Sequence, residues 1–216
     1  MSDPLIIKIC GIKTEAILDA AIDAGADMVG FVHFPRSPRH LELDPIAELI
    51  SMTRGRAESC VLLVNPDNTL VAQVAALGPD WIQLHGPETP HRVAAIRDEA
   101  GIAIMKACPI GGPADVAAVA GFAASADRIL LDARPPHGAT RPGGLGESFD
   151  WGLLKALDPE LSFMLSGGLT PASVADAITA TRPAGIDVSS GVETAPGVKD
   201  AGLIRAFIEK ARAAHV

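Results

Sequence analysis

Short apolar runs alternate with amphipathic stretches along the whole chain, and this pattern predicts alternating β-strands and α-helices. Several helix-like segments open with a capping side chain before Pro or before an early turn. These starts are Asp44-Pro45, residues 65–69, Thr89-Pro90 and Thr170-Pro171. The expected strands are residues 5–10, 28–33, 60–64, 81–85, 102–107, 128–132, 162–166 and 185–189. Eight strands and about eight helices give roughly 27 residues per unit, which predicts an α/β fold of the (β/α)8 TIM-barrel type.

The chain has no linker, low-complexity tract or break in composition that would mark a domain boundary. We therefore expect residues 1–216 to form a single (β/α)8 barrel catalytic domain. An open doubly wound sheet is the rival architecture, because it also alternates strands and helices, but it usually has fewer strands. Neither a G-x-G-x-x-G turn nor a G-x-x-x-x-G-K-[ST] loop occurs, so dinucleotide and P-loop functions lose their main support.

A weak internal repeat places a small residue, one spacer and an aspartate just before alternate strands. The instances are Gly25-Ala26-Asp27, Gly78-Pro79-Asp80, Ser125-Ala126-Asp127 and, less clearly, Gly185-Ile186-Asp187, where the aspartate can lie inside the strand. Two-unit periodicity is typical of a closed barrel, in which alternate strands contribute to the same interior layer. The alternative is that Gly and Asp are simply common in turns.

Composition and charge narrow the function classes. Hydrophobic residues make up 48% and charged residues 20% of the 216 residues, which indicates a globular protein. The formal charge is −8 and no basic run occurs, so we expect no nucleic-acid partner. No stretch approaches the ~20 apolar residues of a membrane span, and Asp3 stands where a signal peptide carries positive charge, so we expect a cytoplasmic protein with no membrane partner. The three cysteines have no zinc or disulfide spacing.

The end of the first predicted strand carries a candidate base. Period-two alternation puts Lys8 and Cys10 on one face, with Cys10 at the barrel mouth and Lys8 one layer below. A nearby cation favours the thiolate, so we expect the pKa of Cys10 to fall below its usual value of about 8.5. The alternative is that Cys10 is a small buried apolar residue.

Two further strand ends carry polar groups. Asp132 ends an otherwise apolar run, whose walls favour the protonated form, so Asp132 is a candidate general acid opposite Cys10; alternatively it caps the next loop. Gln83 and His85 share a face, and His85 either polarises a substrate or bonds a backbone carbonyl. The remaining histidines form no obvious ligand set, so we expect no metal.

Three loops are candidate binding segments. Glycine-rich turns at 165–169 and 188–191 follow the seventh and eighth strands, where barrels of this kind bind phosphate, although such turns also serve as plain connectors. Arg36 and Arg39 lie in a proline-stiffened loop that suits a carboxylate, unless they are solvated surface residues. Residues 134–148 have the length and glycines of a lid, the alternative being a disordered connection.

In their order along nearly the whole chain, these motifs resemble the phosphoribosylanthranilate isomerase family of tryptophan biosynthesis. The resemblance rests on Lys8-Ile9-Cys10-Gly11-Ile12, Gly25-Ala26-Asp27, Gly30-Phe31, Ser37-Pro38-Arg39, Gln83-Leu84-His85-Gly86, Leu131-Asp132, Phe149-Asp150-Trp151, Leu165-Ser166-Gly167-Gly168-Leu169 and Asp187-Val188-Ser189-Ser190-Gly191-Val192-Glu193.

The resemblance implies an Amadori rearrangement of N-(5-phosphoribosyl)anthranilate to 1-(2-carboxyphenylamino)-1-deoxyribulose 5-phosphate, without a cofactor. It implies that Asp132 is the general acid, that Cys10 is the general base, and that Arg39 holds the anthranilate carboxylate. Gln83 and His85 are expected to contact the substrate, and Asp187 to lie near the sugar hydroxyls or the phosphate. The phosphate would lie on Gly167, Gly168, Ser189 and Ser190. The family includes monomers and homodimers, so both states are open.

The sequence departs from the family pattern in three places. His33 and Phe34 replace a more usual aromatic pair, Val198 stands where the family often has Lys, and the loop at 134–146 is longer than expected. Two rival functions are kept. One is the related histidine-pathway aminoaldose-ketose isomerase, which takes a substrate with two phosphates and has Asp where this chain has Cys10. The other is a non-catalytic barrel that binds a sugar phosphate.

Overall fold

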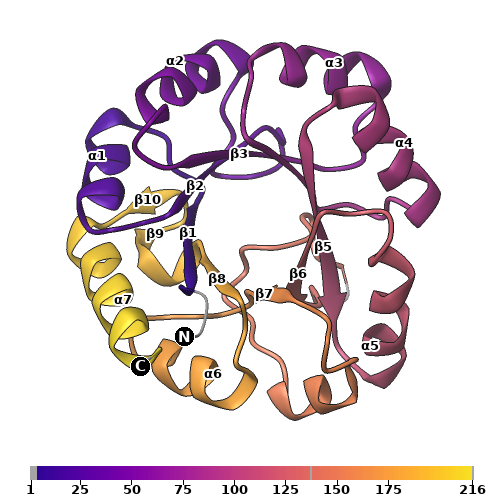
Figure 1. Cartoon of the computed structure of the whole chain (residues 1–216). Helices are drawn as coiled ribbons and strands as arrows, with labels where there is room; N and C mark the ends of the chain where they lie inside the picture. The colour runs from indigo at the N-terminus through magenta and orange to yellow at the C-terminus, as the bar shows by residue number, and fades with distance from the viewer. Residues whose placement is uncertain (1–3, 137, 216) are drawn as a thin grey trace.

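Eight parallel strands close into a barrel in chain order, and the helices surround it (Figure 1). The computed structural model describes residues 4–136 and 138–215. Closure is made by the first and last strands, where Lys8 pairs with Asp187, so the rival open sheet is excluded. The strands are β1 (Ile6–Cys10), β2 (Met28–Val32), β3 (Glu58–Leu63), β4 (Trp81–Leu84), β5 (Ala103–Ile110), β6 (Arg128–Ala133), β7 (Phe163–Leu165) and β8 (Gly185–Val188). All eight predicted strands and the TIM-barrel fold are confirmed.

Seven α-helices are found in the described part of the chain, and most begin close to the predicted starts. Asp67 and Thr89 cap α3 and α4 by accepting from the amides of Leu70 and Arg92. The predicted start at Thr170 is three residues early, because residues 171–173 form a turn before α6. The helices are α1 (Glu15–Asp23), α2 (Leu43–Thr53), α3 (Asn68–Ala76), α4 (Pro90–Ala100), α5 (Pro113–Val119), α6 (Val174–Thr181) and α7 (Ala201–Ala214).

The eighth helical position, after β6, is taken by a short 3-10 helix, η2 (Trp151–Ala156). The long loop uses the chain up to Asp150, and Pro159 follows soon after, so too few residues remain for an α-helix. Two further 3-10 turns, η1 (Ala120–Phe122) and η3 (Ser190–Val192), and a small hairpin of β9 (Glu193–Ala195) and β10 (Val198–Lys199) complete the fold. No helix among the described residues is both long and apolar enough to cross a bilayer.

The predicted alternation along the strands separates two apolar regions. One face of β1, with Ile7 and Ile9, packs against the helices in the larger cluster. The opposite face points into the barrel, whose lower interior is closed by buried apolar side chains: Met28, Cys60, Met105, Ala107, Leu130 and Met164. Polar inward positions are therefore left near the C-terminal ends of the strands, where loops can cover them.

The aspartate repeat has a structural meaning at the opposite end of the barrel. Oδ2 of Asp27, Asp80 and Asp127 accepts the amide of a residue near the start of the preceding strand, at 2.7 to 2.8 Å. The donors are Ile7 in β1, Ser59 in β3 and Ile104 in β5. Each aspartate thus ties an even-numbered strand to its odd-numbered neighbour. Asp187 does not belong to this set, because it lies inside β8 and bonds Lys8.

We expect Asp80→Ala to lower the free energy of unfolding by about 1 to 2 kcal/mol, because the Ser59 amide and hydroxyl both lose their acceptor. Urea denaturation measures this difference. Asp98→Ala is the matched control, since its carboxylate only approaches Arg97 at 3.9 Å. Equal unfolding free energies for the two variants would contradict the role given to the repeat.

Candidate active site

A pocket opens at the C-terminal ends of the barrel strands and gathers most of the residues that the sequence singled out for a site, whereas Arg36 lines only an adjoining cavity. Each comes from a strand end or from the loop that follows, which is where parallel strands of a barrel deliver their side chains. Its lining includes Cys10, Arg39, Gln83, His85, Asp132, Ser166, Gly167, Gly168, Asp187, Ser189 and Ser190. The predicted placement of these residues in one pocket is confirmed; their individual roles stay predictions.

A fully buried lysine lies beneath this pocket. The ammonium of Lys8 donates to Oδ1 of Asp187 at 2.8 Å and to Oε1 of Gln83 at 2.7 Å. The other oxygen of Asp187 accepts from Ser166 Oγ at 3.3 Å. Burial lowers the pKa of Lys8, but the adjacent Asp187 carboxylate and the neighbouring thiols outweigh this and raise it, so Lys8 is a permanent cation. The buried charge is balanced within the barrel, as such a charge must be.

This lysine fixes the proton positions of two residues above it. Because Gln83 Oε1 accepts from Lys8, its amide nitrogen faces His85 and donates to Nδ1 at 2.9 Å. The network therefore assigns the proton of neutral His85 to Nε2, which donates to Oδ2 of Asp132 at 3.1 Å. His85 therefore bonds two side chains and not the backbone carbonyl that was the alternative, while its contact with a substrate stays a prediction. Both ends of the Gln83 amide are likewise engaged within the protein.

Asp132 lies near the end of β6 with both carboxylate oxygens in use. Oδ2 accepts from His85, and Oδ1 accepts from the amide of Ala133 at 2.9 Å. The carboxyl group is buried but lines the pocket. A carboxyl held in this way has one orientation and an opening toward the pocket, which suits proton transfer to a bound molecule.

Cys10 points into the pocket from the end of β1 and is 4% exposed. Gly30 on the neighbouring strand makes room for it, since a Cβ there would lie 2.9 Å from Cys10 Sγ. The expected fall in the thiol pKa is wrong for this structure: burial raises the pKa of Cys10 by more than the cations, Lys8 foremost, lower it. The main physical reason is that burial disfavours the charged thiolate, and Asp187, which is paired with Lys8, adds to this by opposing ionisation of the thiol.

Arg39 is buried and held by a residue that the sequence reading did not assign. Its Nε and Nη2 donate to the two carboxylate oxygens of Glu193 at 2.7 and 2.8 Å. Lys199 Nζ donates to the same carboxylate at 2.7 Å and to the Ser189 backbone carbonyl at 2.9 Å. Burial raises the pKa of Glu193, but the hydrogen bonds from Arg39 and Lys199 outweigh it and lower the pKa. The departure at Val198 falls on a position that is 53% exposed.

The expected phosphate corner is built from two turns on neighbouring strands. Gly167 and Gly168 follow β7 with positive φ values of 91° and 63°, and their amides donate to no acceptor within residues 4–136 and 138–215. Ser189 and Ser190 follow β8, and Ser189 Oγ donates to the Cys10 carbonyl at 3.0 Å. Free amides beside small residues suit an anion.

The loop after β6 lies over the pocket, as its glycines suggested. A Cβ at Gly143 would lie 2.7 Å from Asp132 Oδ2 and from His85 Nε2. Farther along, a Cβ on Gly168 would lie 2.7 Å from the Glu147 carbonyl oxygen, so the same loop reaches the phosphate corner. The loop therefore spans the pocket from Asp132 to the turn after β7. His137, which belongs to the predicted lid at 134–148, lies outside the described residues.

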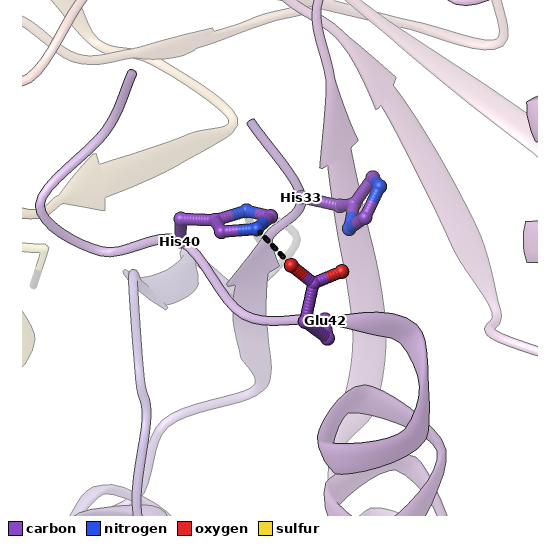
Figure 2. A group of neighbouring side chains, drawn as sticks. All are labelled: His33, His40 and Glu42. Carbon is purple, nitrogen blue, oxygen red and sulfur yellow. Dashed lines mark hydrogen bonds and ion pairs between the residues drawn. The ribbon is translucent and has the colours of Figure 1, made fainter. Parts of the chain in front are cut away.

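Two histidines come together outside the pocket, although the sequence reading expected no histidine cluster. Figure 2 shows His33, His40 and Glu42 just before α2, with donor atoms within 4.8 Å of one another. His33 Nδ1 bonds the Leu41 carbonyl at 2.9 Å, and His40 Nε2 bonds Glu42 at 3.1 Å. Since the Glu42 side chain is 77% exposed, we assign these contacts to holding the loop that carries Arg39. The absence of a metal stays a prediction.

Comparison with known proteins gives one family. Residues 7–210 match the family described as N-(5'phosphoribosyl)anthranilate (PRA) isomerase. An N-(5'-phosphoribosyl)anthranilate isomerase of Nitrobacter hamburgensis is 56% identical over 213 residues, which cover 98% of this chain and 95% of that protein. One of Rhodopseudomonas palustris is 56% identical over 211 residues, or 97% of each chain.

Solved structures agree. A phosphoribosyl anthranilate isomerase of Thermotoga maritima has a TM-score of 0.86 at 31% identity, covering 97% of this chain and all of that one. A second isomerase structure, in complex with reduced 1-(o-carboxyphenylamino)-1-deoxyribulose 5-phosphate, has a TM-score of 0.83 at 29% identity and the same coverage.

The thiol pKa generates a first prediction. The thiolate of Cys10 is measured as the ultraviolet absorbance that wild type shows and Cys10→Ala lacks. As pH rises, this absorbance should develop with a midpoint above 9.0, the upper end of the ordinary thiol range of about 8.5 to 9.0. The subtraction removes the absorbance of the other two thiols, because both proteins contain them. These thiols also ionise at high pH, since burial raises the pKa of Cys60 to about 12 and that of Cys108 to about 11. A midpoint below 9.0 would show that the cations win over burial.

The burial of Lys8 leads to a further testable prediction. Lys8→Met should lower the free energy of unfolding by about 3 to 5 kcal/mol, because it leaves the Asp187 carboxylate buried without its cation. Lys210→Met removes the same charge from an exposed helix position and should change stability little. Chemical denaturation compares the three proteins, and matching losses in the two variants would argue against the pairing.

Proposed function

This chain belongs to the N-(5'-phosphoribosyl)anthranilate isomerase family, and on that premise we propose how its pocket performs the reaction. The reaction is the Amadori rearrangement of tryptophan biosynthesis, an aldose-ketose isomerisation that converts N-(5-phosphoribosyl)anthranilate to 1-(2-carboxyphenylamino)-1-deoxyribulose 5-phosphate. The observation that carries the proposed mechanism is that a thiol and a carboxyl group, Cys10 and Asp132, face the same pocket beside an anion-binding corner.

Asp132 acts as the general acid. Its proton passes to the furanose ring oxygen, the bond from that oxygen to C1′ breaks, and the nitrogen lone pair forms the iminium. The carboxylate left behind keeps the hydrogen bonds from His85 Nε2 and the Ala133 amide. These donors are in place before the reaction, so they stabilise the negative charge as it develops. We assign His85 and Gln83 to positioning Asp132; their direct contact with substrate stays a prediction.

Cys10 acts as the general base. Its thiolate removes the proton from C2′, and the C–H electron pair forms the C1′=C2′ bond while the iminium electrons return to nitrogen. The enol then becomes the ketone: O2′ loses its proton, the electron pair of the C1′=C2′ bond forms a bond from C1′ to a new proton, and with one proton taken up and one given back, Asp132 and Cys10 return to their starting forms. Because burial raises the pKa of the Cys10 thiol above its ordinary value, the thiol is the main form at neutral pH and the thiolate the minor one. The raised pKa also makes that thiolate a stronger base.

The substrate's two anionic ends set its direction in the pocket. The phosphate lies on the turns after β7 and β8, with Gly167, Gly168, Ser189 and Ser190 as its partners, supported by the free amides there. The anthranilate carboxylate lies toward Arg39, whose Nη1 is left over when Glu193 takes Nε and Nη2. Asp187 stays below as the partner of Lys8.

Several expectations accompany this proposal. Residues 1–216 act as one catalytic domain in the cytoplasm on a small-molecule substrate, without a nucleic-acid or membrane partner. Protons and electrons are redistributed within one substrate, so the mechanism calls on no cofactor. Both a monomer and a homodimer remain open for this chain; a dimeric relative is known from Thermotoga maritima.

The roles are tested by following the fluorescence loss of phosphoribosylanthranilate generated in place from anthranilate. Cys10→Ala and Asp132→Asn should each lower kcat by about a hundredfold to ten-thousandfold, the usual contribution of a positioned acid or base. Binding of the reduced product analogue should change little, because both groups act in the transition state.

Cys60→Ala is the matched control, since Cys60 is equally buried but lines no part of the pocket. It should convert substrate at the wild-type rate. Full activity in Cys10→Ala would remove that residue from the mechanism. A folded wild type that binds the analogue but converts nothing would instead favour the non-catalytic sugar-phosphate barrel.

A further inference from the structure

The loop that covers the pocket carries an arginine whose charge no carboxylate of the described residues balances. Arg141 lines the active pocket, and its Nε is buried without a hydrogen-bond partner. Its Nη2 reaches only the Gly144 carbonyl oxygen, at 3.4 Å. Within the described residues no ion pair joins Arg141 to a carboxylate. A buried donor without an acceptor costs free energy, so this position is suited to an acceptor from outside the protein.

A second arginine reaches the same carbonyl. Arg39 Nη2 donates both to Glu193 and, at 3.3 Å, to the Gly144 oxygen, while Nε completes the pair with Glu193 and Nη1 is left over. Two cations thus converge on one neutral oxygen through long hydrogen bonds. Charge-assisted bonds from arginine to a carboxylate are shorter, about 2.7 to 2.9 Å, and stronger. A carboxylate would also offer two oxygens, one for each guanidinium.

The charges of the two arginines differ in a way that matters for a ligand. Glu193 already balances Arg39, whereas the charge of Arg141 has no counterpart among the described side chains. A carboxylate that binds here is therefore balanced by Arg141. Arg39 contributes its free edge and a fixed direction.

The neighbouring space fits an aryl ring. A second cavity adjoins the active pocket through His85, and Arg141 lines both. Its walls are mostly apolar and include Phe34, Val64 and several prolines. A ring in this cavity with a carboxylate on its border would meet Arg141 directly. Phosphate is the poorer occupant, because the loop reaches the phosphate corner only at its other end, where Glu147 meets Gly168.

We propose that Arg141 and Arg39 together form the subsite for the aryl carboxylate of the substrate, and that the Gly144 carbonyl occupies this subsite until the carboxylate displaces it. Arg141 is thereby a specificity-determining residue contributed by the loop that covers the pocket. The proposal rests on the proposed function, since it names the partner of one end of the same substrate.

The test compares two ligands that differ only in the carboxylate. The probes are reduced 1-(o-carboxyphenylamino)-1-deoxyribulose 5-phosphate and its counterpart with a plain phenylamino group, titrated calorimetrically into wild type and Arg141→Gln. Arg141→Gln should weaken binding of the carboxylated ligand by about tenfold to a hundredfold, as expected for losing charge-assisted hydrogen bonds. Binding of the phenylamino ligand should change by less than about threefold.

Arg205→Gln is the control, because Arg205 is an exposed arginine of α7 that lines neither cavity, and its loss changes the net charge equally. It should bind both ligands as wild type does. Arg141→Lys keeps the charge without the planar fork and should recover part of the affinity, and thermal melting of each variant verifies that it folds.

Two outcomes would overturn the proposal. Equal losses for both ligands would assign Arg141 to the phosphate or to the loop itself, and an equal effect of Arg205→Gln would indicate general electrostatic attraction. Failure of the proposed function is recognised separately, by a wild type that does not convert phosphoribosylanthranilate. A converting wild type whose Arg141→Gln variant does not discriminate between the ligands overturns this inference alone.

Discussion

The buried ammonium of Lys8 is the constraint on which the upper half of this barrel depends. An unbalanced charge in a protein interior costs several kcal/mol, so its partners must lie within hydrogen-bond distance. Asp187 supplies the opposite charge. Gln83 has one amide orientation, because its oxygen must face Lys8 to accept a hydrogen bond from the ammonium. The Gln83 amide nitrogen then donates to His85 Nδ1, so His85 donates from Nε2 to Asp132. One lysine on β1 thereby determines which atom of a histidine on the loop after β4 carries the proton.

The same pairing explains why the two groups at the pocket floor have different environments. Asp132 accepts hydrogen bonds from the Ala133 amide and from His85, the last member of the hydrogen-bonded series that begins at Lys8. These donors can stabilise the negative charge that is left when Asp132 gives its proton away. Cys10 receives no comparable donor, and the charge of Lys8 that would favour its thiolate is offset by Asp187. In the proposed mechanism, the different roles of Asp132 and Cys10 follow from how the charge of Lys8 is shared among its hydrogen-bond partners.

Much of this arrangement can be predicted from the sequence, because the strands of a parallel barrel repeat the same geometry. Strand alternation places Cys10 inward, and all strand ends meet at one rim, so Asp132 and the turns after β7 and β8 can be brought together without a structure. The sign of the Cys10 pKa shift could not be predicted, since it depends first on how deeply the closed barrel buries the thiol and then on Asp187, 179 residues from Lys8. Glu193 and the Gly144 carbonyl were missed as partners of Arg39 for the same reason, at separations of 154 and 105 residues. The replacement of one helix by η2 depends on how the preceding loop folds over the pocket.

The two ends of the barrel divide stability from chemistry. At one end, Asp27, Asp80 and Asp127 bond backbone amides and have no contact with the pocket. At the other, Gly143 lies so close to Asp132 that a Cβ there would overlap its carboxylate, which requires a residue without a side chain. This close approach keeps solvent from the acid, and it also means that the loop occupies space the substrate needs. Because the bonds of that loop to Arg39 and Arg141 are long ones to a neutral carbonyl, a substrate carboxylate can replace them at little cost in lost interactions.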